Sequence, residues 1–93
     1  MRAPLTTPTI HRNGTPRSDL QQRYEVAYRM LTAALQALVD TAPHGRDYYL
    51  QEIGAIERAI REHEARLAAV AQVRDELLLL HDSCSEGAQQ LKL

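Results

Sequence analysis

Apolar residues recur at alternating spacings of three and four residues along two separate stretches of the chain. The first stretch runs from Tyr24 to Leu38, and a second apolar track through Tyr28 and Leu35 lies beside it. This spacing keeps one stripe of a helix facing a partner helix, and the second track makes the apolar face broad enough to contact more than one neighbour. The pattern predicts a helix over residues 15–42.

The same repeat resumes after a break rich in turn-forming residues. It predicts a second helix over residues 47–83, with the turn at 43–47. A connection this short joins antiparallel neighbouring helices. The predicted fold is therefore all-α: a long, coiled-coil-like antiparallel hairpin over residues 15–85, which we expect to dimerise into a four-helix bundle. The seam of the second helix, which is also the expected oligomer seam, consists of Ile53, Ile56, Ile60, His63, Leu67, Val70 and Arg74.

Both ends of the chain lack this periodicity. Residues 1–14 are rich in proline and threonine, and we expect them to form a flexible N-terminal arm. Residues 86–93 follow a serine-rich and glycine-containing stretch and are expected to be a frayed C-terminal tail.

The two predicted helices differ in length, and this difference suggests a binding surface. In an antiparallel pair, a first helix of about 25 residues leaves the second helix without a partner beyond about residue 72. Four consecutive leucines fall in that part, and a soluble monomer rarely leaves such an apolar patch bare. A second copy, a different protein or the N-terminal arm would cover it. The candidate partner-binding residues of this overhang are Leu77, Leu78, Leu80, His81 and Cys84.

The turn supplies a second candidate surface, made of Arg46, Tyr48 and Tyr49. Adjacent tyrosines cannot both face the same helical seam, so we expect one to pack under the turn and the other to stay partly exposed. Exposed tyrosine beside arginine is typical of binding hot spots. The alternative is that both tyrosines only close the end of the hairpin.

Three polar residues occupy positions on the predicted apolar seam: His63, Arg74 and His81. Polar seam residues often fix the register or the oligomeric state of packed helices. The alternative is an interface that responds to pH or contacts a ligand, because histidine titrates near neutral pH.

The composition narrows the function classes. The chain has 93 residues, a formal net charge of −1 and one cysteine. These values indicate one small domain without a global attraction to nucleic acid or acidic membranes, and without an intrachain disulfide. The start of the chain has no apolar core of the kind found in signal peptides, and no apolar run reaches the roughly 18 residues that span a bilayer. We expect a soluble cytoplasmic protein that does not bind membranes.

Motifs for catalysis or cofactor binding are not found in the sequence. His81, Asp82 and Cys84 do not have a standard zinc spacing, and a fourth ligand is missing. The chain has no glycine-rich phosphate loop and no Gly-x-Ser-x-Gly elbow. We therefore expect no metal, no cofactor and no enzymatic activity.

The N-terminal arginines leave one further alternative open. Residues 2–23 hold four arginines against a single acidic residue, and arginine is well suited to contact phosphates. A nucleic-acid-associated accessory role is therefore an alternative, although we do not expect nucleic acid to be the main partner. These arginines are Arg2, Arg12, Arg17 and Arg23.

Two short strings resemble a group of small helical proteins encoded by phages and prophages. They are the Asn13-Gly14-Thr15 start and the turn that runs from Gly45 to Tyr49, and the resemblance covers roughly residues 10–70. The group is mostly of unassigned function, so the resemblance transfers no catalytic or binding residue. It implies a mobile-element origin, and small phage proteins of this size often act by binding a host or phage protein. The leucine-rich C-terminal third departs from the group.

The function we expect is therefore non-enzymatic protein binding. The chain would be a small phage accessory protein that pairs with itself and binds a host or phage protein, which it inhibits or redirects, for example in host takeover or counter-defence. The alternative is a structural or assembly component of a virion or scaffold.

Overall fold

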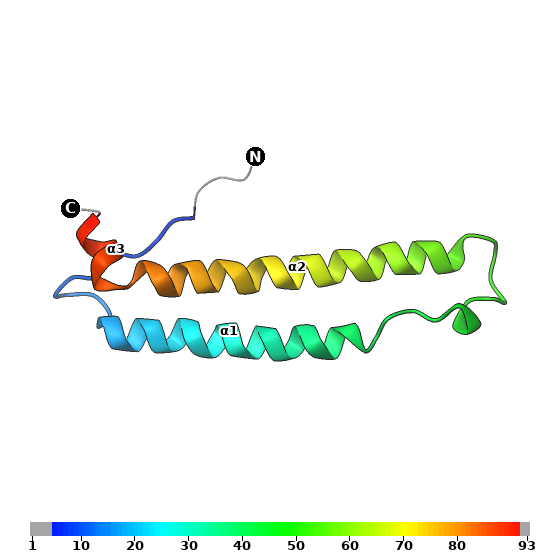
Figure 1. Ribbon diagram of the computed structural model, residues 1–93, viewed down its shortest axis with the longest axis horizontal. Coiled ribbons are helices and arrows are strands. Elements are labelled where there is room, and N and C mark those ends of the chain that lie inside the picture. The colour runs from blue at the N-terminus through cyan, green and yellow to red at the C-terminus, as the bar shows by residue number, and fades with distance from the viewer. Residues whose placement is uncertain (1–4, 92–93) are drawn as a thin grey trace.

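The computed structural model of this chain describes residues 5–91. These residues form two long helices, α1 (Arg17–Val39) and α2 (Ala55–Ser83), and two short ones, η1 (Gly45–Asp47) and α3 (Glu86–Leu91). No strand occurs over this range. The long helices lie side by side and antiparallel (Figure 1), which confirms the predicted all-α hairpin.

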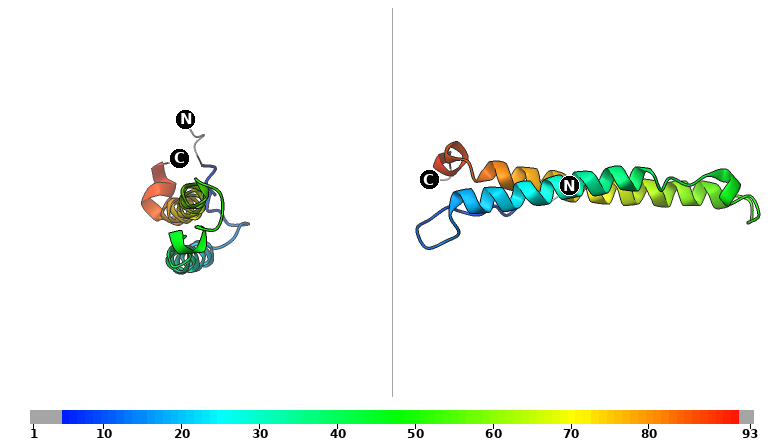
Figure 2. Two further views of the ribbon diagram at one scale, coloured as in Figure 1. Left: turned by 90° about the vertical axis from the view of Figure 1, so that its right-hand side faces the viewer. Right: turned by 90° about the horizontal axis from the view of Figure 1, so that it is seen from below.

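The molecule is extended. Its principal extents are 61 × 27 × 19 Å and its radius of gyration is 19.0 Å, whereas a compact chain of this length has a radius of gyration of about 12 Å. Seen end-on, the long helices form a single pair, and α3 lies beside the end of α2 (Figure 2). Each long helix therefore has one neighbour along most of its length.

The connection between the helices is longer than the turn predicted at residues 43–47. The predicted helices over 15–42 and 47–83 are shorter in the structure, and residues 40–54 are irregular apart from η1. Three successive backbone N–H groups after α1, those of residues 40–42, bond to carbonyls three residues back instead of four, which tightens the last turn and ends the helix.

The start of the second helix is displaced from Asp47 to Ala55 for a local reason. Asp47 donates its backbone N–H to the carbonyl of His44, at 3.0 Å, and this closes the single turn of η1. The chain enters α2 only after Gly54, whose φ of +96° lies in the left-handed region that favours glycine.

The predicted overhang after about residue 72 is wrong. The C-terminal end of α2 lies against the first turns of α1, since Arg17 Nε donates a hydrogen bond to the carbonyl of Cys84 at 2.8 Å. Leu78 lines the same small cleft as Tyr28 of α1. The prediction assumed a turn of a few residues, but the long irregular connection runs opposite the first turns of α2 and shifts the pairing of the helices (Figure 1).

The interior contains few fully buried side chains. Among the described residues, the buried hydrophobic positions are Ala55, Ala59 and Cys84, and the buried polar ones are His63 and Gln89. Most other seam side chains are partly buried, because a two-helix pair covers only one side of each helix.

Candidate protein-binding surfaces

Three large apolar side chains project into solvent where the chain turns before α2. Tyr49 is 75% exposed, Leu50 87% and Ile53 101%. We call these three residues the tip surface. A loop that only closed a hairpin would turn such side chains toward the helices, because exposing them offers no hydrophobic stabilisation.

Backbone hydrogen bonds hold the tip surface in place. Tyr48 donates its backbone N–H to the carbonyl of Gly45, and Gln51 donates to the carbonyl of Tyr48, both at 3.0 Å. The side chain of Tyr48 is partly buried and lines a shallow cleft of about 230 Å³ together with Ile56. The tip surface is therefore presented by a segment with its own local bonding.

An ion pair joins the tip to α2. Glu52 accepts a hydrogen bond from Arg58 and forms a salt bridge with it. The pKa of Glu52 is lowered from its ordinary value of 4.5, first by a hydrogen bond from its own backbone and then by the hydrogen bond and charge of Arg58. This pair links Glu52, two residues before Gly54, to the first turn of α2.

The turn residues proposed from the sequence as a binding surface differ in their exposure. Tyr49 and Arg46 are exposed, whereas Tyr48 is partly buried. Sequence reasoning missed Leu50, and it placed Ile53 on the helical seam, although Ile53 precedes α2 and is fully exposed. The glycine at position 54 was the available signal, since glycine in a left-handed conformation commonly marks a helix boundary.

Most of the other seam residues are buried or partly buried within the same chain, and Ile56 lies beside η1 and Tyr48 of the connection. His63 is 6% exposed, and Ile56, Leu67 and Val70 are partly buried. Arg74 is also partly buried, and its guanidinium pairs with Asp75 at 3.0 Å. Ile60 remains 40% exposed at the edge of the seam. These side chains thus serve the hairpin itself and leave little free for a second copy.

The leucine-rich end of α2 is covered only in part, and Leu79 in it is 55% exposed. Leu77 and Leu80 are partly buried and Cys84 is fully buried, whereas Leu78 is 40% exposed. Leu78 and His81 line a shallow cleft of about 220 Å³ between the helices. Only a small part of the predicted overhang surface is available to a partner.

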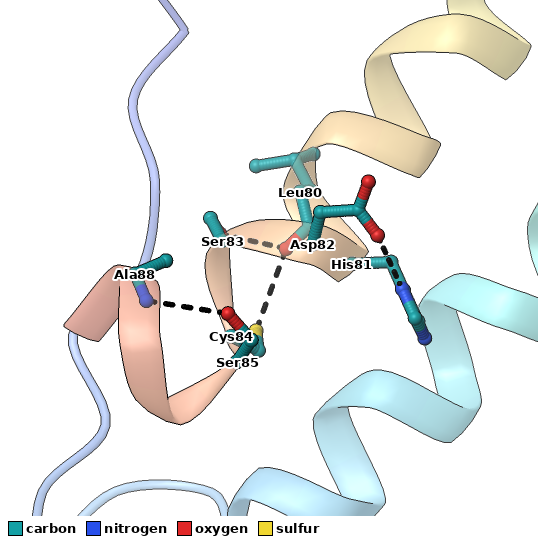
Figure 3. Close-up of polar contacts among 7 residues, drawn as sticks. All are labelled: Leu80, His81, Asp82, Ser83, Cys84, Ser85 and Ala88. Atoms are coloured by element: carbon teal, nitrogen blue, oxygen red, sulfur yellow. Dashed lines mark hydrogen bonds and ion pairs between the residues drawn. The ribbon is translucent and has the colours of Figure 1, made fainter.

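The polar groups at this end bond within their own turns (Figure 3). The hydroxyl of Ser83 and the thiol of Cys84 both donate to the carbonyl of Leu80, at 2.7 and 3.4 Å. The ring of His81 lies beside α1, with its Nδ1 atom 3.0 Å from Asp82. Over the described residues, no three histidine, cysteine or acidic side chains converge to hold a metal ion.

One buried amide joins the N-terminal arm to α3. The Gln89 side chain donates to the carbonyls of Pro8, at 3.1 Å, and Ser83, and it accepts the backbone N–H of Ile10 at 2.9 Å. The tail expected to fray therefore contains α3, and the arm predicted to be flexible is bonded to it at two points. We call these contacts the Gln89 clamp; no sequence pattern distinguished Gln89 from its neighbour Gln90.

The N-terminal arginines do not form a free phosphate-binding set. Arg17 bonds to the Cys84 carbonyl and lies 3.6 Å from the carboxylate of Glu86. Arg12 and Arg23 are exposed, and Arg2 lies outside the described residues. The arginine nearest the helix start thus helps to close the end of the hairpin.

Comparisons with family models, curated proteins and solved structures found no match for this chain. Among the described residues, none of the helices has the length and apolar character needed to cross a membrane.

Proposed function

We propose that this chain is a non-enzymatic protein-binding module whose tip surface contacts a host or phage protein. The observation that carries the proposal is the exposure of Tyr49, Leu50 and Ile53, at 75% or more each, on a hydrogen-bonded segment. A few well-packed side chains near the centre of an interface supply most of its binding energy, and tyrosine is among the residue types enriched there. Holding them in place before binding reduces the entropy lost on association.

The kind of partner follows from the resemblance to small phage proteins. The string from Gly45 to Tyr49, which carries much of that resemblance, forms η1 and the start of the tip. We propose that the tip binds a cytoplasmic host or phage protein and inhibits or redirects it. We propose that the effect comes from occupying a surface of the partner.

Site-specific photo-crosslinking in phage-infected cells tests this proposal. A photoreactive phenylalanine analogue at Leu50 should give a discrete adduct with one partner, and Ile53→Asp in the same chain should abolish it. The matched control carries the analogue at Gln72, an exposed position in the middle of α2. If Leu50 and Gln72 give the same adducts, or if neither gives any, the proposal is wrong.

A structural or assembly role is the second candidate, and the exposure of apolar residues on α1 favours it. Val26 and Met30 are 42% and 63% exposed, far from the tip. We propose that two hairpins pair through such surfaces into a four-helix arrangement. An assembly role further requires larger species that grow with concentration, whereas a closed dimer keeps a constant mass in light scattering.

A further inference from the structure

The outer side of α1 carries a second repeat that the hairpin does not use. Its positions alternate at spacings of three and four residues, like the seam, but fall on the opposite face of the helix. Val26 and Met30 in this repeat are 42% and 63% exposed, and Ala33 and Ala37 are also exposed. We call the whole set the outer stripe: Arg23, Val26, Met30, Ala33, Ala37 and Asp40.

The middle of this stripe lies on a stretch of α1 that carries no charged side chain. Residues 30–39 contain no acidic or basic side chain, and neither do residues 67–73 of α2. Tyr28 and Leu78 line the same cleft, which places these two uncharged stretches opposite each other, given equal rise along both helices. A neighbour can pack on this stretch without burying a charged group.

The outer stripe is symmetric about its centre, which lies between residues 31 and 32. Pairing two copies antiparallel about this point sets Met30 against Ala33 of the other copy, and Val26 against Ala37. Large side chains thereby meet small ones, which lets two helices approach closely. At both ends Arg23 meets Asp40, whereas parallel pairing would place like charges together.

We infer that the outer stripe is the surface on which a second copy of this chain packs, with the two α1 helices antiparallel across a two-fold axis. Such an interface is self-complementary, as two-fold contacts require. Arg23 and Asp40 are exposed, and no side-chain hydrogen bond or ion pair within the described chain engages either of them. They remain available for each other across the axis.

The large exposed surface area of the hairpin supports the view that a second copy of the chain covers the outer stripe. The chain exposes 7137 Å², while a compact monomer of its mass exposes about 5,400 Å². The excess is about 1,700 Å², and a standard stable interface buries roughly 800 Å² on each partner. Pairing through the outer stripe would therefore remove a large part of the excess without using the tip surface.

A charge placed in the stripe tests the surface. This inference rests on the proposed pairing of two hairpins and is independent of partner binding at the tip. The unmodified protein should have the mass of two 10.5 kDa chains in light scattering, and Ala33→Lys should reduce it to one chain. Gln36→Lys, on the polar side of the same helix, is the matched control and should stay dimeric. Circular dichroism should show equal helix content in both variants, because both positions are exposed within the hairpin.

Reversing the terminal charges tests the antiparallel register. Arg23→Asp alone and Asp40→Arg alone should each weaken the dimer by about tenfold, because each creates two like-charge contacts. The double variant should restore the original affinity. A monomeric unmodified protein, a dimer that tolerates Ala33→Lys, or a double variant weaker than either single one would overturn the inference. A tip variant such as Ile53→Asp should leave the mass unchanged, so a failed search for a tip partner does not bear on this result.

Discussion

Single side chains, and not a large core, close the two ends of this hairpin. At one end the Gln89 clamp joins the arm, α3 and the end of α2, and Gln89 is 9% exposed. At the other end Glu52 pairs with Arg58 across the left-handed Gly54. A buried amide with all its polar atoms bonded is costly to disturb, because the groups it served lose their partners away from water. Substitution of the buried Gln89 should therefore destabilise its end of the hairpin more than substitution in the exposed Glu52–Arg58 pair destabilises the other end.

Replacing Gln89 by alanine should detach the N-terminal arm. The substitution removes the acceptor of the Ile10 N–H and the donor to Pro8, and unpaired buried groups cost about 1–3 kcal/mol. Hydrogen exchange should report this as faster exchange of the Ile10 amide, by about tenfold or more. Gln72→Ala is the control, because Gln72 is exposed on α2. Equal exchange at Ile10 in the two variants would show that the clamp does not hold the arm.

The carboxyl group of Glu52 should make the tip sensitive to acid. Its pKa is lowered in the fold, so the ionised form stabilises the tip above pH 4.5, and this contribution is lost as the pH falls through the folded-state pKa. Arg58→Gln should raise the pKa of Glu52 only part of the way to 4.5, since the backbone hydrogen bond is the larger cause. An NMR titration of the Glu52 side chain measures both values. Arg61→Gln, one turn further along α2, should leave the pKa of Glu52 unchanged. If Arg58→Gln also left this pKa unchanged, the pairing of Glu52 with Arg58 would be contradicted.

At the scale of elements, the sequence predicted both long helices but not the segment between them. Periodicity identifies a helix wherever one of its faces is half-buried. It therefore predicted the helical segments from Tyr24 to Leu38 and from Leu67 to Leu77, which lie in α1 and α2. It fails at Ile53, because an exposed apolar residue can coincide with the repeat by chance. The path of residues 40–54 depends on η1 and on the conformation of Gly54, neither of which leaves a periodic signal. The error in this one segment displaced the pairing of the helices and created an overhang that the structure does not have.

The start of α2 at Ala55 gives two neighbouring isoleucines opposite roles. Ile53→Ser should change the free energy of unfolding by less than about 0.5 kcal/mol, because Ile53 is fully exposed. Ile56→Ser, one turn later and partly buried, should cost about 1–2 kcal/mol. Urea denaturation of the two variants measures this difference. Equal losses would mean that the second helix begins before Ile53 and that both side chains belong to the seam.

At the scale of the whole molecule, the hairpin is long and only two helices thick, so it has no large hydrophobic core. A chain of this size that folds as one pair of helices has few fully buried side chains, and oligomerisation is one of the ways in which small domains of this kind gain stability. The tip surface and the outer stripe lie on different parts of the hairpin, one at an end and one along the side of α1. Self-pairing and partner binding can then occur together, and an antiparallel pair would carry a tip surface at each end.

The distance between the two tips distinguishes antiparallel from parallel pairing. The centre of the outer stripe lies about 30 Å along the axis from Leu50, as estimated from the helical rise. Spin labels on Leu50→Cys in a Cys84→Ser background should therefore be about 60 Å apart in an antiparallel dimer, as measured by pulsed EPR. A label on Arg29→Cys, close to the proposed axis, should give about 20–30 Å in either arrangement and confirms that two chains are present. A short Leu50 distance alongside the short Arg29 distance would mean that the tips point the same way, and the dimer would then present them to one partner surface and not at opposite ends.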